Sequence, residues 1–172
     1  ELESEVRNMA GAVDVRHLRI APLPGPVGNE AAGGGATRGQ VGAAAFRGTA
    51  VESGIAHGLV NGAETSECVD LARKEFARLS AFSTDPKKEA EQGYIPDMVK
   101  IGLGELRPYG RPTSTQGAVR VDVDGLSVPI IGYYDFMWAD HGIIVDLKTS
   151  SRLTSKVESA HARQVSLYSR AM

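Results

Sequence analysis

The hydrophobic pattern of this chain changes its period once, close to the Pro-Tyr-Gly-Arg-Pro segment at 108–112. Before that segment, apolar residues recur every three to four positions, which is the spacing of amphipathic helices. After it, Val119, Val121 and Val123 alternate with other residues, as in a strand with one buried face. Helices followed by a run of strands favour an α+β fold over alternating α/β units.

The pattern predicts an antiparallel β-meander flanked by helices. The helices that we predict span residues 46–60, 67–81, 86–106 and 156–172. The strands that we predict span residues 118–123, 126–138 and 142–148. Turns at Asp124-Gly125 and at Asp140-His141-Gly142 would join these strands as hairpins.

The first quarter of the chain has a composition of its own. Of the 25 residues from Ala21 to Ala45, 17 are Ala, Gly or Pro. Such a segment has too little apolar surface to offset the entropy lost on ordering. We therefore expect a flexible arm over residues 1–45 and a single folded domain over residues 46–172.

Composition excludes several classes of protein. The 172 residues include one cysteine, Cys68, which rules out an internal disulfide framework and a zinc site built from cysteines. There is no run of 18 apolar residues, so we expect no membrane span, and the default location is the cytoplasm. The net charge of −2 argues against coating of nucleic acid by bulk positive charge, but leaves room for local basic groups.

The last predicted hairpin carries two carboxylates. A turn centred on Asp140 and His141 makes Asp135 and Asp146 direct cross-strand partners, whose Cβ atoms would lie roughly 4.5–5.5 Å apart. Lys148 shares the face of Asp146, because side chains alternate along a strand. The opposite, apolar face would hold Ile143, Val145 and Leu147. Paired carboxylate oxygens suit Mg²⁺ or Mn²⁺, which prefer oxygen ligands.

A structural interpretation of the same residues stays open. Asp135 could be a polar strand residue, Asp146 an edge residue, and Lys148 a side chain that extends into solvent. A register slip of one residue would also move the two carboxylates to opposite faces.

Four short motifs occur together in a distinctive order. They are Arg47-Gly48-Thr-Ala-Val-Glu52, Gly132-Tyr-Tyr-Asp135-Phe, Asp146-Leu-Lys148-Thr149 and Gln164-Val-Ser-Leu-Tyr168. Taken together, they resemble the PD-(D/E)XK nuclease superfamily, most closely its RecB-like and phage-type exonuclease branch. The likeness covers residues 46–172 and implies a restriction-endonuclease-like core. Members of the superfamily usually continue with further strands after the last motif, so the resemblance leaves open that C-terminal strands are missing here.

The resemblance implies a role for each matching residue. Asp135, Asp146 and Glu52 would be catalytic carboxylates that bind Mg²⁺ or Mn²⁺, with the backbone carbonyl of Leu147 as a further ligand. Lys148 would orient the attacking water and stabilise charge on the phosphate. Without the hairpin motifs, a solvated helix glutamate would be the preferred interpretation of Glu52.

The resemblance also implies contacts with DNA. Gln164 and Tyr168 lie four positions apart on one face of the last predicted helix, and that face would support the metal centre and touch the DNA strand. The alternative is that this face packs on the sheet, with Tyr168 in the core. Arg47 could bind a phosphate or be a surface arginine.

These inferences lead to one favoured function and two alternatives. The favoured function is a Mg²⁺- or Mn²⁺-dependent deoxyribonuclease, an exonuclease of recombination, repair or phage replication, in a bacterium or a phage-infected host cell. The first alternative is a non-catalytic DNA-binding or scaffold module that keeps the nuclease fold. The second is an unrelated α+β binding domain. In each case a second copy or a partner chain could complete the sheet.

Overall fold

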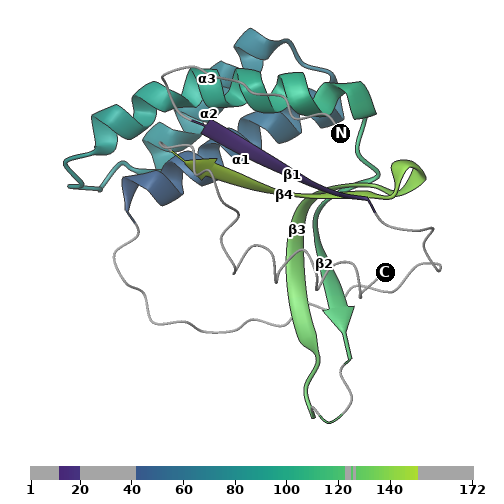
Figure 1. The fold of residues 1–172 in the computed structure, drawn as a ribbon. Coiled ribbons are helices and arrows are strands. Elements are labelled where there is room, and N and C mark those ends of the chain that lie inside the picture. The colour runs from purple at the N-terminus through teal and green to yellow at the C-terminus, as the bar shows by residue number, and fades with distance from the viewer. Residues whose placement is uncertain (1–11, 20–41, 123–124, 126, 151–172) are drawn as a thin grey trace.

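The computed structural model describes residues 12–19, 42–122, 125 and 127–150, which form a layer of helices packed on one side of a sheet (Figure 1). The helices are α1 (Ala43–Asn61), α2 (Thr65–Leu79) and α3 (Lys88–Leu106). The strands are β1 (Ala12–Arg19), β2 (Ser114–Val121), β3 (Ile130–Trp138) and β4 (Ile143–Ser150). Short 3-10 turns occupy η1 (Arg107–Tyr109) and η2 (Ala139–His141). The described part of the chain is therefore an α+β fold, as predicted.

The strands form one antiparallel sheet in the order β1-β4-β3-β2. The meander of β2, β3 and β4 confirms the predicted order of the three strands. The predicted turn between β3 and β4 is also present, with Gly142 in the left-handed conformation at φ 59°. Glycine adopts this conformation without the steric cost that a side chain brings.

Strand β1 is a departure from the sequence prediction. Residues 12–19 fall within the expected flexible arm, but they pair with β4 along its whole length, from Ala12 opposite Ser150 to Arg19 opposite Ile143. In this register Asp14 is the partner of Lys148 and Arg16 the partner of Asp146. Backbone N–H and C=O groups on the edge of β4 that faces away from β3 need hydrogen-bond partners, and a paired strand supplies a partner for each of them. The prediction of a flexible arm is therefore wrong for residues 12–19.

Helix α1 lies unusually close to its neighbours. Its predicted stripe of Val51, Ile55 and Leu59 is buried. A Cβ atom at Gly54 would lie 2.7 Å from the carbonyl oxygen of Cys68 in α2, and one at Gly58 would lie 2.7 Å from Leu103 Cδ2 in α3. A larger residue at Gly54 would push against the backbone of α2, and one at Gly58 would displace the side chains of Leu103 and Cys68. The glycines that weaken α1 as an isolated helix are thus needed for its packing.

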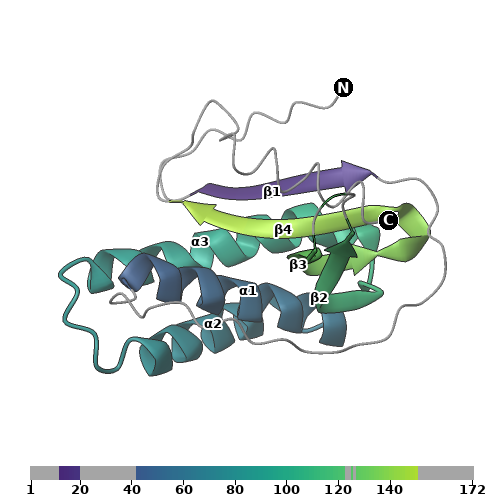
Figure 2. The ribbon, with the colours of Figure 1, turned by 90° about the horizontal axis from the view of Figure 1, so that it is seen from below.

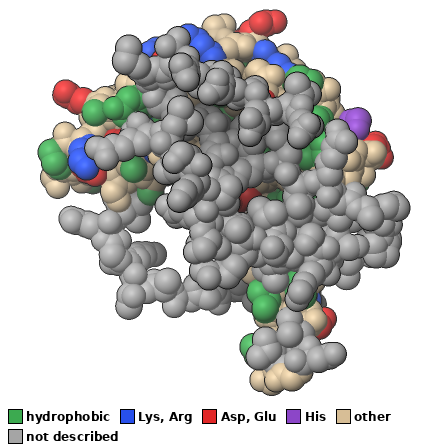
Figure 3. Space-filling model, viewed as in Figure 1, with side chains coloured by type: hydrophobic (Ala, Val, Ile, Leu, Met, Phe, Trp, Pro, Cys, Tyr) green, Lys and Arg blue, Asp and Glu red, His purple; other side chains and the backbone are tan. Residues whose placement is uncertain are grey.

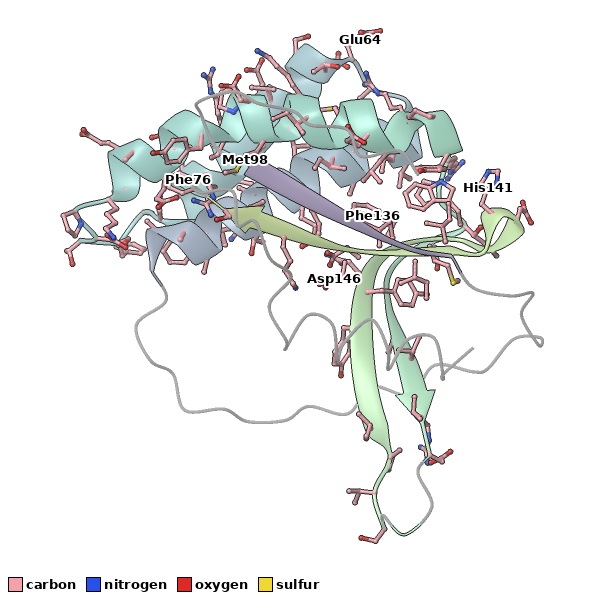
Figure 4. The ribbon with its side chains drawn as sticks, viewed as in Figure 1. Glu64, Phe76, Met98, Phe136, His141 and Asp146 are labelled. Atoms are coloured by element: carbon pink, nitrogen blue, oxygen red, sulfur yellow. The ribbon has the colours of Figure 1, made fainter. Side chains whose placement is uncertain are left out.

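The core lies between the helix layer and the inner face of β3 and β4. Alternate residues of these strands point into it, and the largest fully buried side chains include Phe76, Met98, Phe136 and Trp138 (Figure 4). The indole Nε1–H of Trp138 donates a hydrogen bond to the carbonyl of Gly110 at 2.9 Å. Figure 2 shows β1 and β4 running side by side along the helix layer. This packing fixes which side chains of β4 point away from the helices.

Strands β2 and β3 form an arm that projects from the helix–sheet layers (Figure 1). Val121 pairs with Ile130, so residues 122–129 form the connection. The predicted tight turn at Asp124-Gly125 is therefore wrong, and β3 begins four residues later than expected. Pro129, directly before β3, has no N–H group with which to extend the ladder.

Two sequence predictions concern other parts of the chain. The predicted helix over 156–172 lies outside the described residues. Among the described residues, no helix is both long and apolar enough to span a membrane.

Candidate carboxylate site where the sheet divides

The register of the β3–β4 hairpin is the predicted one. Phe136 pairs with Val145, Met137 with Ile144, and Trp138 with Ile143. The next pair in this register would be Asp135 and Asp146, but the described ladder stops before it. From this point β4 continues beside β1, whereas β3 turns away with β2 (Figure 1). Asp135 and Asp146 therefore lie where the sheet divides.

The side chain of Asp135 bridges the two strands at this division. Its Oδ2 accepts a hydrogen bond from the backbone N–H of Leu147. A side-chain acceptor thus takes the place of the backbone carbonyl that a continuing ladder would supply. This contact fixes Asp135 against β4, one residue beyond Asp146. The role predicted for the Leu147 carbonyl stays a prediction.

Asp146 lies on the face of β4 that is turned away from the helices (Figure 4), and Lys148, two residues later in the strand, shares this face. Their neighbours Val145 and Leu147 are buried in the helix-facing core, as the alternation predicts. Lys148 Nζ lies 2.7 Å from Asp146 Oδ2. The Asp146 side chain is 16% exposed and that of Lys148 is 40% exposed. The ammonium group is thus held by Asp146 and remains accessible to a ligand.

Electrostatics place four of the predicted residues in one neighbourhood. Burial, and after it the nearby carboxylates of Glu52 and Asp146, together raise the pKa of Asp135 from 3.8 to about 6. The Leu147 N–H and the Lys148 ammonium act in the opposite direction on the same pKa. Two negative charges close to the half-buried carboxyl group of Asp135 disfavour its ionised form, so they favour the binding of a proton or a metal cation.

Helix α1 contributes Glu52 to this neighbourhood, and β2 contributes a residue that the sequence did not identify. Gln116 Nε2 donates a hydrogen bond to Glu52 Oε1 at 2.9 Å. On β2, Thr115 pairs with Phe136 and Gly117 with Tyr134, which places Gln116 opposite Asp135. No periodicity or motif marks Gln116 in the sequence, because its position depends on pairing between distant segments.

A second connection joins α1, α3 and the end of β4. Arg47 is 3% exposed and forms a buried ion pair with Glu91 of α3. Its Nη2 also donates to the carbonyl of Thr149 at 3.1 Å, one residue after Lys148. The alternative of a surface arginine is therefore wrong. The predicted contact of Arg47 with DNA stays a prediction, and its partner Glu91 was not identified from the sequence.

The oxygen donors of this site suit Mg²⁺ or Mn²⁺ by their chemistry. One oxygen of each carboxylate already accepts from the protein: Asp135 from Leu147, Asp146 from Lys148, and Glu52 from Gln116. Within the described residues, no three His, Cys, Asp or Glu side chains are gathered closely enough to hold a metal ion. Binding of a divalent cation would therefore require these side chains to converge.

A different surface feature lies at the start of α1. A depression of about 630 Å³ is lined by Phe46, Leu79, Phe82, Asp85 and Pro86, among others. Its acidic residue is already used, because Asp85 Oδ2 accepts from the N–H of Ala43 at 2.8 Å and caps α1. The depression therefore offers shape but little reactive chemistry.

The DNA-contacting pair Gln164 and Tyr168 lies outside the described residues, so both roles stay predictions. Comparisons with protein-family models, with curated proteins and with solved structures gave no match to this chain.

Proposed function

We propose that this protein is a Mg²⁺- or Mn²⁺-dependent nuclease of the PD-(D/E)XK type that hydrolyses phosphodiester bonds in DNA. One observation carries the proposal: where the sheet divides, Asp135 accepts a hydrogen bond from the Leu147 N–H of β4, and on the same strand Lys148 Nζ lies 2.7 Å from Asp146 Oδ2. Glu52 and Asp146 lie near enough to raise the pKa of Asp135 as well. Half-buried carboxylates that repel one another, beside an ammonium group, are arranged for a cation and an anionic substrate together.

The chain's own residues account for the roles that hydrolysis needs. Glu52, Asp135 and Asp146 would supply oxygen ligands to a divalent metal ion, and the chemistry that such an ion would supply is a lower pKa of bound water and polarisation of the scissile phosphate. Asp146 Oδ2 positions the Lys148 ammonium group, whose Nζ lies 2.7 Å away. The Lys148 side chain is partly exposed, so its ammonium group can reach a phosphate oxygen. A positive charge held there stabilises the negative charge that develops on the phosphate.

The β2–β3 arm supports a polynucleotide as the substrate. Ile131 and Tyr133 precede Asp135 at alternate positions of β3 and therefore share its face. Tyr133 is 61% exposed and Ile131 is 44% exposed. Figure 3 shows hydrophobic side chains exposed on this arm, at the bottom of the view. Exposed aromatic rings beside a phosphate-directed site are suited to stacking on bases.

The finer description of the activity rests on the sequence resemblance. It favours an exonuclease of recombination, repair or phage replication, in a bacterium or a phage-infected host cell. It also assigns the DNA contacts to Gln164, Tyr168 and Arg47. A contact of Arg47 with DNA would require its buried ion pair with Glu91 to open.

A cleavage assay on the full chain tests the proposal. Duplex and single-stranded DNA labelled at the 5′ or 3′ end would be incubated with Mg²⁺ or Mn²⁺. We expect cleavage by the wild type, and a loss of about 10²- to 10³-fold in Lys148→Ala, which removes one group that stabilises the transition state. The polarity of the labelled products shows whether the enzyme is an exonuclease.

A matched variant on α3 provides the control. Lys100→Ala removes an exposed lysine whose Nζ lies 3.8 Å from Asp97 Oδ1. Lys100 is not one of the proposed site residues, so this variant should leave cleavage unchanged. Binding of DNA without cleavage would contradict the proposal and favour the scaffold alternative. If the protein neither bound nor cleaved DNA, the alternative of an unrelated binding domain would be favoured.

A further inference from the structure

Gln116 has an unusual backbone for a strand residue. Its φ is 51°, the only positive φ among the described residues other than glycine. This left-handed conformation is unfavourable for a residue with a side chain, and it is uncommon for glutamine. It lies inside β2, whose other residues pair with β3 on both sides of it. Strained residues persist where the surrounding structure imposes them, and they cluster at functional sites.

The strained backbone accompanies a specific contact. Gln116 lies opposite Asp135 in register, and its side chain reaches out of the sheet to α1, where Nε2 donates to Glu52 Oε1 at 2.9 Å. This bond joins α1, which carries the predicted ligand Glu52, to β2. Strand β2 pairs with β3, which carries the predicted ligand Asp135. The contact is exposed, so it contributes little to the core.

We infer that Gln116 is a positioning residue, which orients the Glu52 carboxylate toward the strands so that it can converge with Asp135 and Asp146 on a divalent cation. The inference rests on the proposed function and adds a residue that the sequence motifs do not contain. An amide donor leaves the charge on Glu52 intact and restricts its side chain. Donors of this kind around a metal ligand fix its orientation and strengthen binding.

A purely structural role predicts a different behaviour. If Gln116 only connects two paired segments of β2, replacing it by glycine removes backbone strain and has no effect on a cation. The positioning role predicts that the same substitution weakens cation binding, even as the strain is relieved. Stability and metal affinity then change in opposite directions.

The test measures Mn²⁺ affinity by isothermal titration and the melting temperature in EDTA, on the full chain. For Gln116→Gly we expect a melting temperature equal to or above that of the wild type and a Mn²⁺ affinity about 10- to 100-fold weaker. Gln116→Asn, which tolerates the left-handed conformation but has a shorter side chain, should also weaken Mn²⁺ binding. It provides a second variant should glycine disturb the strand.

Thr115→Gly is the matched control, because Thr115 pairs normally with Phe136 in the same strand. It should lower the melting temperature and leave the Mn²⁺ affinity unchanged. Equal Mn²⁺ affinity in the wild type, Gln116→Gly and Gln116→Asn would overturn the inference and leave the proposed function standing. A wild type that binds no Mn²⁺ would overturn the proposed function and the inference with it.

Discussion

Asp135 should make the stability of the protein depend on pH in an unusual direction. Its pKa is raised to about 6 in the folded state, above the ordinary value of 3.8, so the folded state binds the proton more tightly than the unfolded state. The stabilisation is complete below about pH 3.8 and is lost as the pH rises through about 6. The shift corresponds to at most about 3 kcal/mol, and solvent screening of this partly exposed group reduces it.

The measurement is urea unfolding in EDTA between pH 4 and pH 7.5, for the wild type and Asp135→Asn. The free energy of unfolding of the wild type should fall relative to that of the variant as the pH rises. Asparagine has the same shape as aspartate and carries no charge. The titration of the other carboxylates therefore contributes to the free energy of unfolding of both proteins and cancels in their difference. Parallel pH profiles for the two proteins would show that Asp135 is not held among like charges.

At the scale of single residues, the sequence predicted the positions of the hairpin residues better than the contacts that surround them. Asp135, Asp146 and Lys148 could be placed because a short hairpin fixes its own register through local pairing. Gln116 and Glu91 could not, since each reaches the site through a contact with a segment more than 40 positions away. Such contacts leave no periodic trace in the sequence.

Among the structural elements, the β2–β3 arm leads to a prediction about substrate binding. Tyr133→Ala removes an exposed ring from the face shared with Asp135, so the affinity for a single-stranded oligonucleotide should fall by about 5- to 150-fold. Ile130→Ala removes a partly exposed side chain from the other face of β3 and should have little effect. Fluorescence anisotropy in Ca²⁺ measures binding. Equal losses in the two variants would exclude a stacking role for Tyr133.

The contact between α1, α3 and β4 leads to a prediction about stability. Glu91→Ala leaves the buried Arg47 guanidinium without its carboxylate, which should cost about 3–5 kcal/mol in the free energy of unfolding. Arg47→Met combined with Glu91→Leu should cost less than the sum of the two single changes, because no unpaired charge remains. Urea unfolding measures both effects.

The ion pair of Arg78 and Glu75 on the surface of α2 is the control for that comparison. Glu75→Ala should give no measurable change in the unfolding midpoint, because water stabilises both charges when they are separated. If Glu91→Ala behaved like Glu75→Ala, the buried pair would not hold α1 against α3.

The helices and the meander were predictable because their signals are local. The stripe of Val51, Ile55 and Leu59 and the alternation in β4 both report a buried face at close range. Strand β1 was missed because its charged residues interrupt the apolar pattern and its pairing is with the far end of the chain. Its register joins Asp14 to Lys148 and Arg16 to Asp146, which only the structure reveals.

The whole molecule has its proposed site at the point where two parts of the sheet separate. Strands β4 and β1 stay with the helix layer, and β3 leaves with β2. Glu52 comes from the layer of helices, Asp146 and Lys148 from the first part of the sheet, and Asp135 from the second. A cation bound there would hold all three parts together, so it should stabilise the entire fold.

Thermal unfolding with and without Mn²⁺ tests this central claim most directly. A metal that binds only the folded state, at a hundredfold excess over its Kd, adds about 2.7 kcal/mol. The melting temperature of the wild type should therefore rise with Mn²⁺ or Mg²⁺, and it should not respond to Na⁺ at matched ionic strength. Asp135→Asn should melt at a higher temperature than the wild type in EDTA and should show no response to Mn²⁺. A wild type whose melting temperature is unchanged by Mn²⁺, and equal to that of Asp135→Asn in EDTA, would contradict the carboxylate site and the nuclease function proposed from it.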